Sequence, residues 1–258
     1  MKNTSAFSIL CSGKWVPEQV LAYDSAQVHI FPPPHGERVQ SYWQKLTARA
    51  DLHLFNGELF RLKDFTANHS CLSLHLERTC YRDQIYSNAH AEELLQNFGE
   101  RAMARGLGVS ALVITADGYL LIIRRGEHLG EEPGKLDIVG GHAHPDRHFT
   151  HGQPDFFGAI FEELETELNL PAAEVIMNAC CGLVENLNTR KPDLVFLTRT
   201  RLAKRDIAER IATAAEADEV ADWLAVPAVP AEIRSFVVTH ESALTPSALA
   251  CLHLLSES

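Results

Sequence analysis

The feature that most constrains this chain is a glycine-ended strand followed, about twenty residues later, by a helix rich in carboxylates. The strand pattern is Leu136 to Gly141, and the helix pattern contains four glutamates within the six residues 162–167. One apolar stripe with helical spacing is formed by Phe157, Ile160, Phe161, Leu164 and Leu168. Such an arrangement can gather divalent cations beside a phosphate chain.

Two of the glutamates are predicted to share one shoulder of this helix. At about 100° per residue, Glu163 and Glu167 lie one turn apart, whereas Glu162 points to the far side. Two like charges at this spacing repel each other, and a hard cation with oxygen ligands relieves the repulsion. The helix pattern therefore predicts a Mg²⁺ site, or Mn²⁺ in its place. The alternative interpretation is a solvated acidic helix face.

This region resembles the signature of the Nudix hydrolases, in which a glycine-containing loop precedes a glutamate-rich helix. Glu163 and Glu167 match the first and last glutamates of the signature helix. Three positions depart from it, because Glu162 replaces an arginine, Thr166 a glutamate and Asn169 a glycine. Asparagine can adopt the left-handed conformation that glycine has at a helix end, whereas Thr166 removes one candidate metal ligand.

A divergent Nudix subgroup that hydrolyses UDP-glucose and UDP-galactose is more similar still. The matching segments are Thr79 to Asp83, Leu107 to Val109, Leu120 to Arg125, Leu136 to His142 and Asn169 to Pro171. The resemblance implies an α/β/α sandwich with a mixed sheet. It also implies Mg²⁺-dependent hydrolysis of a UDP-hexose to UMP and a hexose 1-phosphate, with a small-molecule nucleotide sugar as the partner.

The resemblance also implies a set of site residues. The metal ligands would be Glu163 and Glu167, with Asp155 or Glu216 as the third carboxylate, and the two helix glutamates would be catalytic. Either Arg124 or Arg125 should face inward, because strand side chains alternate, and that arginine would bind the diphosphate. The expected substrate-binding residues are Tyr81, Arg82, Asn88, Arg124, Arg125, Asp137, Gly141, His142, Asn186 and Asp193.

Several of these residues have a structural interpretation that competes with the functional one. Tyr81 and Arg82 are expected to recognise uridine, but the alternative places Tyr81 in the core and pairs Arg82 with Asp83. Glu216 belongs to an acidic turn that solvent alone could explain.

Two other functions compete with UDP-hexose hydrolysis. The changes at Glu162 and Thr166 are compatible with a catalytically weak protein that binds or senses a nucleotide sugar. A Nudix hydrolase of ADP-ribose or of another nucleoside diphosphate derivative is the second alternative.

Composition excludes some partners. The net charge of −11 argues against a general nucleic-acid or anionic-membrane binder, and no apolar run reaches the roughly 18 residues of a transmembrane helix. The six cysteines have no CxxC spacing and are expected to be buried free thiols in a cytoplasmic protein. No pattern predicts the oligomeric state.

The chain is expected to divide into a small N-terminal α+β extension, residues 1–90, and a Nudix domain, residues 91–258. Helices are predicted over 38–50, 91–105, 203–214 and 246–255, the last capped by Thr245. Strands are predicted over 7–10, 19–22, 27–31, 59–65, 72–81, 111–115, 119–123, 135–139, 175–185 and 194–200.

Overall fold

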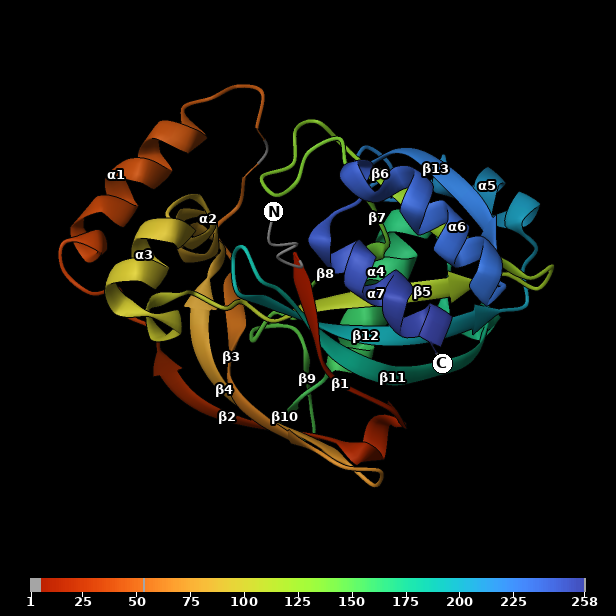
Figure 1. Ribbon diagram of the computed structural model, residues 1–258, viewed down its shortest axis with the longest axis horizontal. Helices are drawn as coiled ribbons and strands as arrows, with labels where there is room; N and C mark the ends of the chain where they lie inside the picture. Colours follow the sequence, from red (N-terminus) through yellow and green to blue (C-terminus); the bar gives the residue numbers. More distant parts are fainter. Residues whose placement is uncertain (1–5, 53, 258) are drawn as a thin grey trace.

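The fold is built on a mixed eight-stranded sheet (Figure 1). The computed structural model describes residues 6–52 and 54–257. The main strand order is β1-β11-β12-β5-β6-β13, with β7 paired to β6 and β8 paired to β5. Only β12 and β5 pair in parallel; the other pairs are antiparallel. The strands are β1 (Phe7–Trp15), β5 (Gly108–Ile114), β6 (Tyr119–Arg125), β7 (Leu136–Asp137), β8 (Val139–His142), β11 (Val175–Asn186), β12 (Lys191–Thr200) and β13 (Val220–Pro227).

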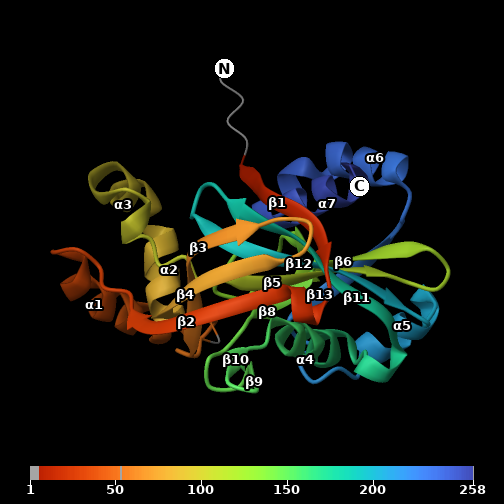
Figure 2. The same cartoon turned by 90° about the horizontal axis from the view of Figure 1, so that it is seen from below.

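Helices cover both faces of this sheet, because alternate residues of its strands enter two separate cores. Val113 and Ile123 pack with α4 (Phe156–Leu168) and α5 (Lys204–Ile211), and their neighbours Ile114 and Ile122 pack with α6 (Pro230–His240) and α7 (Pro246–Glu257). Figure 2 shows α6 and α7 on one side of the sheet and α4 on the other. The predicted α/β class with a mixed sheet is confirmed.

A smaller three-stranded sheet lies beside the large one and has the order β2-β4-β3. Its strands β2 and β4 are parallel, and β3 and β4 are antiparallel. Its elements are β2 (Val20–Val28), β3 (Glu58–Ala67) and β4 (Leu72–Cys80), accompanied by α1 (His35–Thr47), α2 (Tyr81–Ala89) and α3 (Ala91–Phe98). The remaining short elements are η1 (Pro17–Gln19), η2 (Glu100–Ala102), β9 (Phe149–Thr150), β10 (Gln153–Pro154), η3 (Ala172–Glu174) and η4 (Glu241–Ala243).

The sheets do not follow the boundary predicted at residue 90. Strand β1 lies in the large sheet, where it pairs with β11. Residues beyond 90 also contact the small sheet. The Leu62 N–H of β3 donates to the Arg105 carbonyl, and the Leu107 N–H donates to the Phe60 carbonyl of β3. The division into two domains at this point stays a prediction.

The ends of two helices follow the sequence closely. Asn169 ends α4 in the left-handed conformation, with φ of 51°, and its N–H donates to the Glu165 carbonyl at 2.9 Å. At the start of α7, the Thr245 hydroxyl accepts a hydrogen bond from the Ala248 N–H at 3.0 Å. Both caps were predicted.

Other local predictions were partly right. The strand predicted over 72–81 is present as β4 and ends at Cys80, and the unpredicted helix α2 begins at Tyr81. The helix predicted over 91–105 ends at Phe98, because Gly99 has φ of 73° and the chain turns into η2. Strand β13 and helix α6 were also not predicted.

The six cysteines are free thiols, as predicted, although only Cys180 and Cys251 are fully buried. Among the described residues, no helix is long and apolar enough to cross a membrane.

Candidate active site

A cleft with two adjoining cavities lies where α4, β8 and the loop after β6 meet the small sheet and the helices that accompany it. The first cavity, called the catalytic lobe, has a volume of about 310 Å³ and is lined by Glu163, Gly141 and Tyr81 among others. The second lobe has a volume of about 460 Å³ and extends toward α1 and α2. The two lobes share Arg125, Leu129, Gly130, Glu131, Asp137, Lys191 and Ser247.

Glu163 lines the catalytic lobe, and Glu167 lies buried one helical turn behind it on α4. Glu167 is only 3% exposed, and its Oε2 atom has no hydrogen-bond partner among the described residues. Burial and the neighbouring Glu216 and Glu219 carboxylates raise the pKa of Glu163 to about 8. Burial, followed by the charge of Glu163, raises the pKa of Glu167 well above its ordinary value. Burial and mutual repulsion therefore favour protonation of this pair, and a bound cation would favour its charged form instead.

The glycine at the end of the signature strand gives Glu163 its place. A Cβ atom on Gly141 would lie 2.2 Å from the Glu163 Oε1 atom and 2.6 Å from its Cδ atom. Only a residue without a side chain therefore lets β8 approach α4 with the carboxylate between them. This explains in physical terms why a glycine-ended strand and a glutamate helix occur together.

One of the two adjacent arginines faces the cleft, as the alternation of a strand predicts. Arg125 lines both lobes, pairs with Asp137 at 3.4 Å and donates from Nε to the Glu131 carbonyl at 3.0 Å. Arg124 lines neither lobe and donates to the Gly134 carbonyl at 3.0 Å. Of the predicted arginine pair, the geometry selects Arg125.

Most of the other predicted substrate-binding residues also lie around the cleft. Tyr81, Asp137, Gly141, His142 and Asp193 line the catalytic lobe. Burial lowers the pKa of His142 to about 3, so its imidazole is neutral at physiological pH. Burial raises the pKa of the Tyr81 hydroxyl, which therefore stays protonated.

The predicted asparagines line the second lobe. Asn88 donates from Nδ2 to a Glu131 oxygen at 2.6 Å, and the Asn186 side chain accepts from the Asn188 N–H at 2.9 Å. The structure thus brings residues from β4–α2, β6–β8 and the β11–β12 turn to one cleft.

Asp155 is not brought into this cleft. It caps the N-terminus of α4, where its Oδ1 accepts from the Gly158 N–H at 2.7 Å and its Oδ2 accepts from the Thr150 hydroxyl at 2.6 Å. Glu163 lies two turns further along the helix, about 12 Å at 1.5 Å per residue. The alternative third carboxylate, Glu216, does line the catalytic lobe.

Several cleft residues were not predicted as site residues, among them Glu131, Lys191 and Glu219. Lys191 Nζ lies 3.4 Å from a Glu131 oxygen between the two lobes. Opposite charges, with Lys191 foremost, hold the pKa of Glu131 at about 2 despite the burial that opposes them. Glu219 is carried by the same acidic turn as Glu216, and the Glu216 N–H donates to the Thr166 carbonyl at 2.9 Å.

The residues present fit a divalent cation. The half-buried Glu163 and the Glu167 oxygen that lacks a partner among the described residues supply the hard oxygen donors that Mg²⁺ prefers. Within residues 6–52 and 54–257, no group of three or more Asp, Glu, His and Cys side chains could hold a metal ion. Such a cation would therefore take the remaining ligands from water and substrate, as Mg²⁺ sites commonly do.

Arg82 lies away from both lobes. Its Nε pairs with Asp83 at 2.8 Å, one Nη donates to the Gln40 side chain at 3.2 Å, and its N–H donates to Asn56 at 2.8 Å. We therefore expect Arg82→Ala to lower the melting temperature by a few degrees and to leave KM within about two-fold of wild type. Differential scanning calorimetry and steady-state kinetics measure the two effects. A ten-fold rise in KM with an unchanged melting temperature would return Arg82 to the substrate site.

Sequence comparison finds relatives of this chain among named enzymes. It is 29% identical over 203 residues to the mouse protein named uridine diphosphate glucose pyrophosphatase NUDT22, a match that covers 69% of this chain and 66% of the mouse protein. The chain thus spans just under two thirds of that relative's length. The human protein of the same name is 28% identical, over 68% of this chain and 67% of its own length.

A plant protein extends the comparison, and no family model matches the chain. Nudix hydrolase 9 of Arabidopsis thaliana is 23% identical over 218 residues, covering 71% of this chain and 69% of the plant protein. The chain is therefore similar, over about two thirds of its length, to proteins named as a UDP-glucose pyrophosphatase and as a Nudix hydrolase, and it shares with the Nudix signature the glycine-ended strand that meets a glutamate-rich helix.

Proposed function

We propose that this protein hydrolyses the diphosphate bond of a UDP-hexose, UDP-glucose or UDP-galactose, in the presence of Mg²⁺ or Mn²⁺, releasing UMP and a hexose 1-phosphate. The substrate class is supported by the mouse and human relatives, which are named as uridine diphosphate glucose pyrophosphatases. It is also supported by the match to the UDP-sugar subgroup at Tyr81 and Asn88, both of which line the cleft.

One observation carries the proposal: the catalytic lobe holds anionic and cationic groups side by side. Glu163 lines the lobe, with the unpartnered Glu167 oxygen on the same shoulder of α4, and Arg125 and Lys191 line the lobe as well. The carboxylates are suited to a cation and the basic groups to a diphosphate. Because the net charge of the chain is −11, a diphosphate needs local basic groups to bind, and the carboxylates beside them provide for the cation.

The two lobes suit a substrate that extends to both sides of its diphosphate. Arg125 lies where they meet and would donate to a non-bridging diphosphate oxygen there. The second lobe offers amide groups from Asn88 and Asn186 beside apolar side chains such as Leu54 and Ile85. Such a mixture can bind a base or a sugar.

The chemistry is a displacement at phosphorus. The oxygen of a water molecule bonds to one phosphorus, the bridging P–O bond breaks, and the electron pair leaves on the other phosphate. Glu163 and Glu167 would hold a cation, which when bound would lower the pKa of water and neutralise charge on the diphosphate. Glu219, whose pKa burial raises, lies at the lobe and could accept the water proton.

A substrate panel tests this assignment. UDP-glucose, UDP-galactose and ADP-ribose are compared at equal concentration with Mg²⁺, and product formation is followed by chromatography. We expect at least about ten-fold higher kcat/KM for the UDP-hexoses, because a site that hydrogen-bonds one base leaves its polar groups unpaired with another. Faster turnover of ADP-ribose would assign another substrate, and binding of every compound without turnover would indicate a sensor.

A further inference from the structure

A third cavity lies on the opposite side of the β11–β12 turn from the active-site cleft. This seam cavity has a volume of about 870 Å³ and lies between β3 of the small sheet and β1 and the β11–β12 turn of the large sheet. Five basic side chains line it: Arg61, Lys63, Arg101, Arg105 and Arg190. None of these residues lines either lobe of the cleft.

The charge of the seam cavity is opposite in sign to that of the whole chain. Four carboxylates, those of Asp64, Glu77, Glu100 and Glu185, face the five basic groups, which leaves a net charge of +1 against −11 for the protein. Among the described residues, the exposed side chain of Arg101 has no ion-pair or hydrogen-bond partner. A locally basic cavity in an acidic protein is suited to a small anion.

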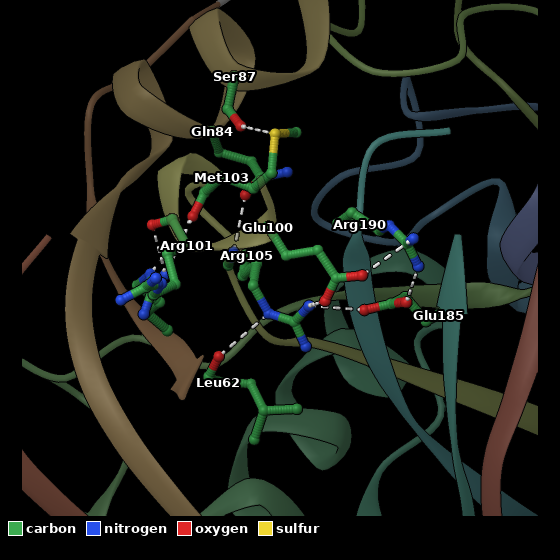
Figure 3. A network of polar contacts seen from close by, with 11 residues as sticks. Leu62, Gln84, Ser87, Glu100, Arg101, Met103, Arg105, Glu185 and Arg190 are labelled. Carbon is green, nitrogen blue, oxygen red and sulfur yellow. Dashed lines mark hydrogen bonds and ion pairs between the residues drawn. The ribbon is translucent and has the colours of Figure 1, made fainter. Parts of the chain in front are cut away.

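Two of the arginines, Arg105 and Arg190, both contact the carboxylates of Glu185 and Glu100, which differ in their exposure to solvent (Figure 3). Arg105 and Arg190 each contact Glu185 at 2.8 Å, and Glu185 is 5% exposed. The same arginines contact Glu100 more loosely, at 3.8 and 3.0 Å, and Glu100 is 55% exposed. Glu185 is therefore a fixed member of the network, whereas Glu100 is a surface carboxylate that another anion can replace.

Two nitrogen atoms of the cavity walls have no hydrogen-bond partner within the part of the chain that the structure describes. They are Arg190 Nε, which always carries a proton, and His29 Nε2, on a side chain that is only 8% exposed. A buried donor without an acceptor costs about 1–3 kcal/mol. A shift of Arg190 toward a bound anion would give its Nε atom an acceptor.

The remaining walls are apolar. They are formed by Leu10, Val28, Ile30, Phe65 and Leu187, and Val28 and Ile30 are 68% and 83% exposed. These side chains provide contact area for the organic part of a ligand next to the basic groups.

We propose that the seam cavity is a second ligand site, for a small organic phosphate whose phosphate group replaces the Glu100 carboxylate on Arg105 and Arg190. Arg101 supplies the additional positive charge that favours a phosphate dianion over the single charge of Glu100, whereas Lys63 and Arg61 are paired with Glu77. The apolar walls select a phosphate monoester with an organic group over inorganic phosphate.

The position of Arg190 connects this site to the cleft. Its neighbours in sequence, Thr189 and Lys191, line the lobes on the other side of the turn, and Arg190 itself has φ of 56°. A ligand that moves Arg190 would therefore also move Lys191 relative to Glu131. This regulatory consequence rests on the proposed function, whereas the binding site itself does not.

Calorimetric titration of the full chain with UMP, glucose 1-phosphate and inorganic phosphate, in the presence of a chelator, tests the site. Arg101→Glu should weaken one binding event at least about ten-fold, because it removes a charge-assisted donor and adds repulsion. Glu100→Gln should strengthen the same event about three-fold or more, because it removes the competing carboxylate. Inorganic phosphate should bind at least about ten-fold more weakly than the preferred monoester.

Arg205→Glu is the matched control, since its side chain is 85% exposed on α5 and the substitution changes the net charge equally. Equal weakening by Arg101→Glu and Arg205→Glu, or unchanged affinity in Glu100→Gln, would overturn the site. Equal binding of inorganic phosphate and the monoesters would overturn the organic ligand class. Binding that changes neither kcat nor KM for the UDP-hexose would overturn only the regulatory consequence.

Discussion

Replacing Glu167 by glutamine is expected to lower kcat at least about a hundred-fold while the protein stays folded. The substitution preserves the shape of a side chain that is 3% exposed, but it removes the charge of the oxygen that has no partner in the structure. Loss of a metal ligand weakens both cation binding and the stabilisation of charge on the diphosphate. Steady-state kinetics across a Mg²⁺ titration measure the effect. Higher Mg²⁺ should restore little of the lost rate.

Glu165→Gln is the control for this experiment, because Glu165 is exposed on the same helix and lines neither lobe. It changes the net charge of the helix by the same amount and should leave kcat within about two-fold. If the two variants behaved alike, Glu167 would not hold a cation, and the glutamates of α4 would act only through their total negative charge.

The second large effect is expected from Gly141→Ala. The added Cβ would lie 2.2 Å from Glu163 Oε1, and the three nearest atoms all belong to the carboxylate end of that flexible side chain. Glu163 should therefore swing away while the backbone stays in place. We expect kcat to fall about ten- to a hundred-fold, since displacements near 1 Å at a reacting centre have costs of this size. The melting temperature should change by only a few degrees.

Gly36→Ala provides the comparison, because a Cβ at Gly36 would meet only the Phe31 carbonyl oxygen, at an ordinary 3.6 Å. This variant should keep full activity. If Gly141→Ala retained wild-type kcat, Glu163 would have to function from a different position. If it unfolded, the contact would be structural, and Glu163→Gln would then decide whether the carboxylate is needed for turnover.

The part of the site that could be predicted from the sequence is the part encoded by local spacing. The apolar stripe of α4 places Glu163 and Glu167 on one shoulder, and Asn169 ends the helix because asparagine tolerates the left-handed conformation. Strand alternation predicted that one of the two arginines faces inward, and the structure selects Arg125. Short-range geometry determines each of these features.

The remaining features depend on contacts between distant segments. Glu131 becomes a cleft residue only because Lys191, 60 residues away, and Asn88, 43 residues away, approach it. Neither lies in a motif whose spacing predicts the contact. Arg82 matches the subgroup pattern, yet it pairs with its own neighbour Asp83.

Asp155 illustrates a second limit of the sequence. It precedes the glutamate helix and carries the residue type that a metal site requires, but an aspartate at that place also caps the helix. Asp155 caps the helix because the Gly158 N–H lies only three residues away, whereas Glu163 lies about two turns further along the helix axis.

We have proposed that the two lobes hold a nucleotide sugar while its diphosphate bond is cleaved. Phosphorus NMR of UDP-glucose incubated with the purified protein and Mg²⁺ follows this bond itself. We expect the paired diphosphate signals to disappear, two monoester signals, those of UMP and glucose 1-phosphate, to replace them, and a chelator to stop the change. Release of UDP and free glucose, or diphosphate signals that persist despite saturating Mg²⁺, would contradict this proposal.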